Sequence, residues 1–281
     1  MLGVDDDSPP DAPLREVQRI EWRGAACSEA PDYLVCEEPL EIRLATQPLV
    51  TLMRTPGHDI ELTWGLLKTE GFVPDLAHIA TVRHCTVVDD PRAEDNVITV
   101  TPKPEAELAL DGMQRNLYAS SSCGVCGKTT IEQVMARAPM VTAGFSVSTK
   151  MLYALPDRMR PEQSVFTRTG GLHAAGLFDA HGTPYVIRED VGRHNAVDKV
   201  MGWRHLNGGA DAARLLLVSG RISYEIVHKA LMAGMAVVAA VSAPSSLAVG
   251  LAREAGLTLV AFLRGERMCV YSAPERITAG D

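Results

Sequence analysis

The chain has no excess of positive charge and no long hydrophobic run. Its 27 Lys and Arg residues against 35 Asp and Glu residues give a net charge of −8, which argues against a nucleic-acid-binding body. The longest apolar run, around residues 235–241, is too short to cross a bilayer, and residues 1–7 have neither the basic nor the apolar segment of a secretory signal. These absences predict a cytoplasmic protein with no nucleic-acid or membrane partner.

Regularly spaced cysteines are also lacking. Six cysteines in 281 residues, without a repeated spacing, indicate a reducing compartment and not a disulfide scaffold. Only Cys123 and Cys126 form a motif, a Cys-x-x-Cys, and there is no second cysteine pair and no His-x-Glu. Neither a structural zinc site nor a zinc deaminase is therefore indicated, and we predict no metal ligands. The other cysteines are expected to be small buried hydrophobic side chains: Cys27, Cys36, Cys85 and Cys269.

The Cys-x-x-Cys lies in a glycine-containing loop that leads into a predicted helix. Apolar residues recur there with a period of 3.6 and follow a capping-box spacing, from Thr129 to Ala138. The positive end of that helix and the neighbouring Lys128 favour a thiolate. Such a thiolate suits a redox pair or a carrier of a group such as a sulfane sulfur, and the spacing alone does not choose between them.

The length and the ordinary hydrophobic content, 46%, predict two domains behind a disordered tail. Residues 1–14, rich in Asp and Pro, form the tail, residues 15–117 a small α+β domain, and residues 118–281 an α/β domain. In the first domain we expect two antiparallel strand pairs and one helix, with Thr55 and Pro56 as its N-cap and first residue and Gly71 as its C-cap. The predicted elements are strands 40–44, 50–53, 80–88 and 96–101 and a helix over 55–70.

The second domain alternates strands and helices from residue 185 onward. This alternation predicts a sheet covered by helices on its faces. The expected strands are 185–188, 215–218, 236–241, 257–262 and 268–271.

Small residues and arginines follow several of these strands, at the sheet edge where α/β proteins bind ligands. Glycines let backbone N–H groups approach an anion and guanidinium groups hold phosphate, so we predict a site for an extended, phosphate-bearing ligand. Each residue taken alone could equally be a turn glycine or a solvated arginine. Neither a P-loop nor a Rossmann fingerprint is present. His173 and His194 are the nearest histidines and either could serve as a proton shuttle, although a structural role is commoner. The predicted site residues are Gly192, Arg193, Ser219, Gly220, Arg221, Ser242, Arg264, Gly265 and Arg267.

Long stretches of the chain also match a known family. The second domain contributes residues 122–127, 189–199, 219–225, 241–248 and 257–262, and the first domain contributes 55–59 and 70–71. These segments resemble the FdhD family, sulfur carrier proteins required to make active formate dehydrogenase, from about residue 35 to the C-terminus. Two departures are visible: residues 45–47 replace an Asn-Gly turn, and Trp64 stands where a smaller residue is usual.

The resemblance implies a cytidine-deaminase-like three-layer α/β domain without zinc chemistry. It implies a sulfurtransferase in which Cys123 accepts a persulfide sulfur from a cysteine desulfurase. The sulfur would pass to the molybdenum or tungsten bis-molybdopterin guanine dinucleotide cofactor of formate dehydrogenase. Cys126 would resolve or relay the sulfur, or shape the loop. A homodimer is also implied. The guanine nucleotide, for which GDP could stand in, would be held by Phe262, Leu263, Arg264, Gly265, Glu266 and Arg267.

Two other functions stay open on the sequence alone. A thiol–disulfide oxidoreductase would use Cys123 and Cys126 as a reversible pair. A chaperone that binds the molybdenum cofactor without transferring sulfur would need Arg264 and Arg267 but not Cys123.

Overall fold

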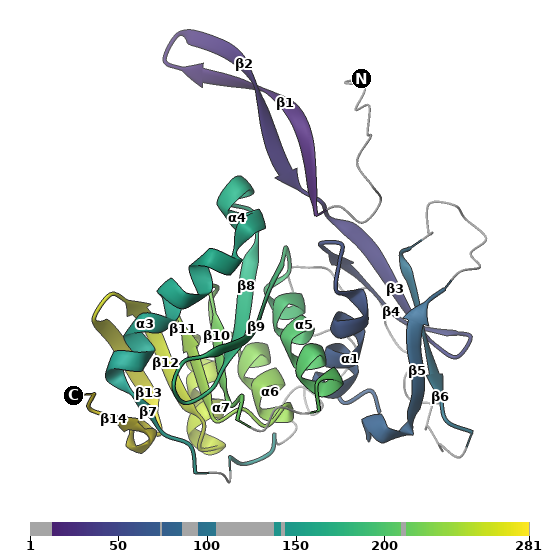
Figure 1. Ribbon diagram of the computed structural model, residues 1–281. Coiled ribbons are helices and arrows are strands. Elements are labelled where there is room, and N and C mark those ends of the chain that lie inside the picture. Colours follow the sequence, from purple (N-terminus) through teal and green to yellow (C-terminus); the bar gives the residue numbers. More distant parts are fainter. Residues whose placement is uncertain are drawn as a thin grey trace.

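The computed structural model describes residues 13–73, 75–85, 95–104, 138–141, 144–208 and 212–280 (Figure 1). The Cys-x-x-Cys, the helix predicted after it and the predicted domain boundary at residue 117 lie outside the described residues. Within these ranges, no helix is long and apolar enough to cross a membrane.

The described chain begins with a hairpin that the sequence analysis missed. Strands β1 (Leu14–Arg23) and β2 (Ala26–Val35) pair along their full length and project from the body of the molecule (Figure 1). The amide of Cys36 donates to the carbonyl of Pro13 (3.0 Å) and closes the base of this hairpin. Pro13 and Leu14 thus belong to the hairpin and not to the predicted tail. Cys27 is exposed, so the prediction of a buried side chain was wrong there.

A four-stranded sheet follows, in the order β4-β3-β6-β5. Both predicted antiparallel pairs are confirmed, and the parallel pairing of β3 with β6 joins them. Ala45 takes a positive φ of 53° in the β3–β4 turn, the conformation that the Asn-Gly turn usually supplies. The elements are β3 (Glu38–Leu44), β4 (Gln47–Arg54), the 3₁₀ turn η1 (Leu76–His78), β5 (Ile79–His84) and β6 (Val97–Pro102).

Helix α1 (Asp59–Thr69) covers this sheet and begins later than predicted. His58, with a φ of 61°, is its N-cap, and Gly71 follows its end with a φ of 68°. Thr55 is instead buried against residues 189–199: its Oγ1 accepts from the amide of Val191 (3.1 Å). A tertiary contact therefore overrides the capping pattern at Thr55 and Pro56.

The second sheet has six strands in the order β13-β12-β11-β10-β8-β9. Strands β10, β11 and β12 are parallel, and β8, β9 and β13 run antiparallel to their neighbours. Strand β8 was not predicted, because its sequence of Ala and Gly resembles no half-buried strand. The strands are β8 (His173–Phe178), β9 (Pro184–Asp190), β10 (Leu215–Val218), β11 (Val237–Ala240), β12 (Thr258–Arg264) and β13 (Arg267–Ser272).

Helices cover both faces of this sheet, as the α/β prediction required (Figure 1). One face packs against α5 (Arg193–Leu206), α6 (Tyr224–Met232) and α7 (Ser246–Glu254), and the other against α3 (Thr149–Met159). Beyond α3 lie the turn η4 (Arg160–Glu162) and the short helix α4 (Ser164–Thr169). The remaining elements are β7 (Val147–Ser148), η5 (Pro274–Arg276) and β14 (Ile277–Thr278).

Helices α1 and α5 join the two sheets through two glycines. A Cβ added to Gly65 would overlap the backbone oxygen of Asp198, and one added to Gly202 would overlap that of Glu61. The two backbones are therefore in direct contact. Trp64 lies beside this contact, with its ring centroid 4.7 Å from that of His205.

Candidate functional site

The predicted site residues gather at one edge of the six-stranded sheet. The parallel strands β10, β11 and β12 end there, and the antiparallel register pairs His173, at the start of β8, with Asp190, at the end of β9. The segments after β9, β10 and β11 therefore meet at the carboxyl edge, which is where the alternation predicted a ligand.

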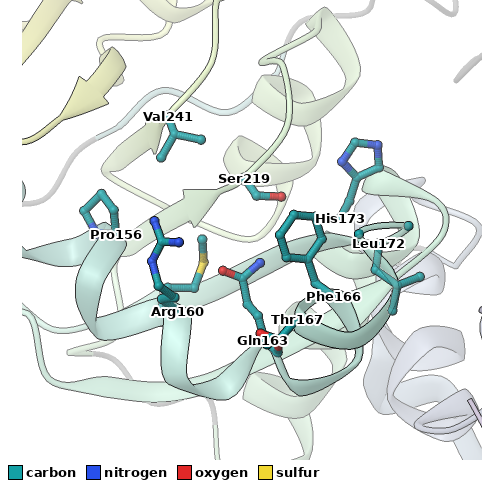
Figure 2. A pocket seen from close by; sticks show the side chains of 12 residues that line it. Pro156, Arg160, Gln163, Phe166, Thr167, Leu172, His173, Ser219 and Val241 are labelled. Carbon is teal, nitrogen blue, oxygen red and sulfur yellow. The ribbon is translucent and has the colours of Figure 1, made fainter. Parts of the chain in front are cut away.

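A cavity of about 940 Å³ opens at this edge. Figure 2 shows side chains from α3 and α4 on one side of it and His173, Ser219 and Val241 on the other. This volume is in the range that holds a nucleotide-sized ligand. Its lining residues are Pro156, Met159, Arg160, Gln163, Phe166, Thr167, Gly170, Gly171, Leu172, His173, Ser219 and Val241.

Local hydrogen bonds hold the helical wall of the cavity in place. Ser148 caps α3 by accepting from the amide of Met151 (3.1 Å). The carboxylate of Glu189 accepts from the amides of Val165 (3.0 Å) and Phe166 (2.8 Å) at the start of α4. Glu189 belongs to the segment 189–199, so that segment positions the far wall of the cavity as well as its own loop.

His173 forms part of the opposite wall. Burial lowers the pKa of its imidazole, and the nearby charges of Arg193 and Arg221 lower it further. The ring packs on Gly220, where an added Cβ would lie 3.2 Å from Nδ1. A neutral imidazole beside two guanidinium groups can accept or donate a hydrogen bond at neutral pH.

The arginine at the start of α5 has unused hydrogen-bonding capacity. The Nε of Arg193 is buried and, within the described part of the chain, has no hydrogen-bond partner. Gly192 is the N-cap of α5 and packs against the side chain of Asn195, where an added Cβ would lie 2.8 Å from Nδ2. The buried Nε of Arg193, at the N-terminus of this fourteen-residue helix, and the exposed guanidinium of Arg221 suit an anionic ligand group.

Ser219 and Ser242 serve the framework of the site. The Oγ of Ser219 accepts from the amide of Ala174 (2.8 Å), and its own amide donates to the carbonyl of Ala174 (2.9 Å). The carbonyl of Ser242 accepts from the amide of Phe262 (3.1 Å). Of the predicted site residues, Ser219 is the one that lines the cavity itself.

The segment 262–267 lies next to the cavity wall and comprises the end of β12, the turn at Gly265 and Glu266, and the first residue of β13. Nε of Arg264 donates to the carbonyl of Val241 (3.2 Å), which brings the turn against a cavity-lining residue. Phe262 and Gly265 have positive φ angles of 54° and 53°. Leu263 is fully buried in the core, so its side chain is not available to a ligand. The exposed side chains of this segment are Phe262, Arg264, Glu266 and Arg267.

His194 is not among the residues that line the cavity. Its Nε2 lies 3.4 Å from the Oγ of Ser223, and burial, assisted by Lys229 and Arg193, lowers its pKa to about 4. This is the structural role that the sequence analysis considered the commoner one.

Sequence reasoning missed Gln163 and Phe166 altogether. Both lie in the short elements after α3, a stretch without helical periodicity or a recognisable motif. The neighbouring Gly170 and Gly171 were the only local signal of a turn.

The fold and site together define an α/β protein whose candidate ligand site is a cavity at the carboxyl edge of a mixed sheet. Residues 35–278 match the FdhD/NarQ family, and the chain belongs to that family. It is 48% identical over 268 residues to the sulfur carrier protein FdhD of Streptomyces coelicolor, covering 94% of each chain. It is 48% identical over 255 residues to the protein of the same name from Mycobacterium tuberculosis, covering 88% of this chain and 92% of that one.

The fold is also found in a solved structure. The crystal structure of a candidate formate dehydrogenase accessory protein from Desulfotalea psychrophila has a TM-score of 0.75 and 24% sequence identity, and the match covers 95% of this chain and 100% of that one.

Proposed function

We propose that this protein is a sulfur carrier that serves formate dehydrogenase. The proposal follows the names of its relatives, which share nearly half of its residues over most of its length. The cysteine that would carry the sulfur is Cys123, in the loop outside the described residues. The single structural observation that supports the proposal is the cavity at the carboxyl edge, lined by Ser219 and Val241 of the family-matching segments that follow β10 and β11.

Loading would begin with attack by the Cys123 thiolate on the outer sulfur of a cysteine desulfurase persulfide. A new S–S bond forms, the donor's S–S bond breaks, and the donor cysteine leaves as a thiolate. The transferred sulfur keeps its oxidation state, so no further oxidant is required. In delivery, the acceptor supplies the electron pair of the new bond and Cys123 leaves as a thiolate.

The acceptor would be the bis-molybdopterin guanine dinucleotide cofactor, as the substrate of the transfer and not as a resident group of the protein. Its pyrophosphates suit the guanidinium groups of Arg193 and Arg221 and the N-terminus of α5. The segment 262–267 lies against the same cavity wall and would contact the nucleotide through Phe262, Arg264 or Arg267. Leu263 would contribute its backbone only. A cytoplasmic location and a homodimer belong to this proposal.

The test is intact mass and peptide mapping after incubation with an active cysteine desulfurase and cysteine. We expect one extra, reductant-labile sulfur on the Cys123 peptide and none in Cys123→Ala. The exposed Cys27 is an internal control for unspecific sulfur transfer, because its peptide should stay unmodified. Cys123→Ala should also fail to activate formate dehydrogenase. Full activation by Cys123→Ala would favour the chaperone, and a catalytically competent Cys123–Cys126 disulfide would favour the oxidoreductase.

A further inference from the structure

Gln163 is a buried polar residue whose side-chain carboxamide forms no hydrogen bond with the described part of the chain. The residue is only 9% exposed. Its main chain is committed locally: the amide donates to the carbonyl of Arg160 (3.1 Å), and the carbonyl accepts from Oγ1 of Thr167 (2.7 Å). Within the described ranges the carboxamide makes no hydrogen bond, so its donors and acceptor stay available to a ligand in the cavity.

The carboxamide points into the cavity. Figure 2 shows its oxygen and nitrogen directed towards the centre of the cavity, facing the side of Ser219 and Val241. A carboxamide offers one acceptor and two donors in one plane, so it can form two parallel hydrogen bonds with a ring edge that has a donor beside an acceptor.

An aromatic ring stands next to this polar group. Phe166 is three residues beyond Gln163 at the start of α4, lines the same cavity and is 41% exposed. An exposed phenyl ring in a cavity wall is a stacking surface for a flat heterocycle. Arg160 lines the same cavity beside Gln163, and on the other wall the charges of Arg193 and Arg221 lower the pKa of the His173 imidazole. The cavity thus combines a surface suited to a planar ring with cationic groups suited to an anion.

We propose that Gln163 reads the ring edge of the ligand in this cavity and that Phe166 stacks on the ring. The ligand class is a heterocycle with a 2-amino-4-oxopyrimidine edge, the edge that guanine and pterin share. The choice of this edge rests on the proposed function, because a carboxamide can also pair with adenine. The existence of a base-reading position rests on the unpaired carboxamide that faces the cavity and on the phenyl ring beside it.

The experiment measures the affinities of the full-length protein for GDP, ADP, a free pterin and inorganic pyrophosphate by calorimetry. Gln163→Leu should weaken GDP binding by about tenfold or more, because two hydrogen bonds are lost, and should leave pyrophosphate binding unchanged. Phe166→Ala should weaken GDP binding to a similar extent. Gln47→Leu, at an exposed glutamine, is the matched control and should change neither affinity.

The pyrophosphate measurement separates base reading from a damaged site, because a collapsed cavity would weaken the binding of both GDP and pyrophosphate. Binding of GDP or of the free pterin that depends on Gln163 supports the proposal, and the tighter of the two identifies the end of the cofactor that enters the cavity. Equal affinity for GDP and ADP, or unchanged GDP binding in Gln163→Leu, would overturn it. So would a wild-type protein that binds neither GDP nor the pterin. Sulfur loading on Cys123 is measured independently, so a failed base-reading test leaves the carrier step standing, and the reverse also holds.

Discussion

Oδ2 of Asp190 lies 2.8 Å from Nζ of Lys199, and both side chains are almost completely buried. The same carboxylate accepts from the amides of Thr55 (3.2 Å, to Oδ2) and Gly192 (2.8 Å, to Oδ1). Nζ of Lys199 also donates to the carbonyl of Thr55 (2.9 Å). One buried ion pair thus joins the family-matching segment 55–59 to the segment 189–199.

Lys199→Met should destabilise the protein by about 3–5 kcal/mol, because it leaves the carboxylate of Asp190 buried without its counter-ion. Urea unfolding monitored by circular dichroism would measure the loss. Lys68→Met, at an exposed lysine on α1, is the control and should change the free energy of unfolding by less than about 0.5 kcal/mol. Equal stabilities of the two variants would contradict the assigned role of the ion pair.

Gly65→Ala should destabilise the packing of α1 on α5 severely, because the new methyl group would meet the backbone of Asp198, which cannot move aside as a side chain can. Overpacking of this kind costs about 1–3 kcal/mol or more. Gly250→Ala, on the exposed surface of α7 with no atom within 4 Å of the new Cβ, should instead stabilise by up to about 1 kcal/mol through helix propensity. Thermal unfolding measures the stability of both variants. An unchanged stability of Gly65→Ala would contradict this prediction, because it would show that α1 and α5 can move apart at little cost.

Two buried groups near α5 should give opposing pH dependences of stability. His194, with its pKa lowered to about 4, stays neutral while the unfolded chain takes up a proton, so it costs stability as the pH falls below about 6.5. Burial raises the pKa of Asp198 to about 6 against the opposing charge of Lys229, so its carboxylate takes up a proton in the folded state first and adds stability over the same fall.

His194→Gln removes the first of these contributions only. Relative to the wild type, the variant should gain about 2 kcal/mol of stability when the pH is lowered from 7 to 4.5. Chemical denaturation at both pH values measures the difference in free energy of unfolding between variant and wild type at each pH. His181→Gln, at an exposed histidine, is the control, and a wild-type-to-variant difference that does not change with pH would refute the buried neutral imidazole.

Glu189→Ala should weaken GDP binding several-fold without removing a group that touches the ligand. Its carboxylate holds the start of α4, and the loss of such a cap costs about 0.5–2 kcal/mol of local stability. Gln163 and Phe166 would then be held less firmly in the cavity wall. Calorimetry with GDP measures the effect, and Glu162→Ala, at an exposed carboxylate in η4, should leave the affinity unchanged.

The sequence predicted most elements of the second sheet closely. Strand 215–218 has the predicted bounds, and α7 begins at a local N-cap, where the side chain of Ser245 accepts from the amide of Ala248. The hairpin β1–β2 was missed because its polar, half-exposed strands bury no continuous apolar face. Strand β8 was missed because Ala and Gly carry little strand propensity, and this strand forms through pairing with its neighbours.

Local chemistry in the sequence was sufficient to determine the α/β class, the alternation of strands and helices, and the segments that would meet at the carboxyl edge. Those features depend on residues near one another in the chain. Only the tertiary structure decided that Thr55 joins Asp190 instead of capping a helix, that Gly65 and Gly202 bring two helices into backbone contact, and that Gln163 and Phe166 face the cavity. Each of these depends on burial and contact between segments that lie far apart in the chain, and no local pattern encodes such a contact.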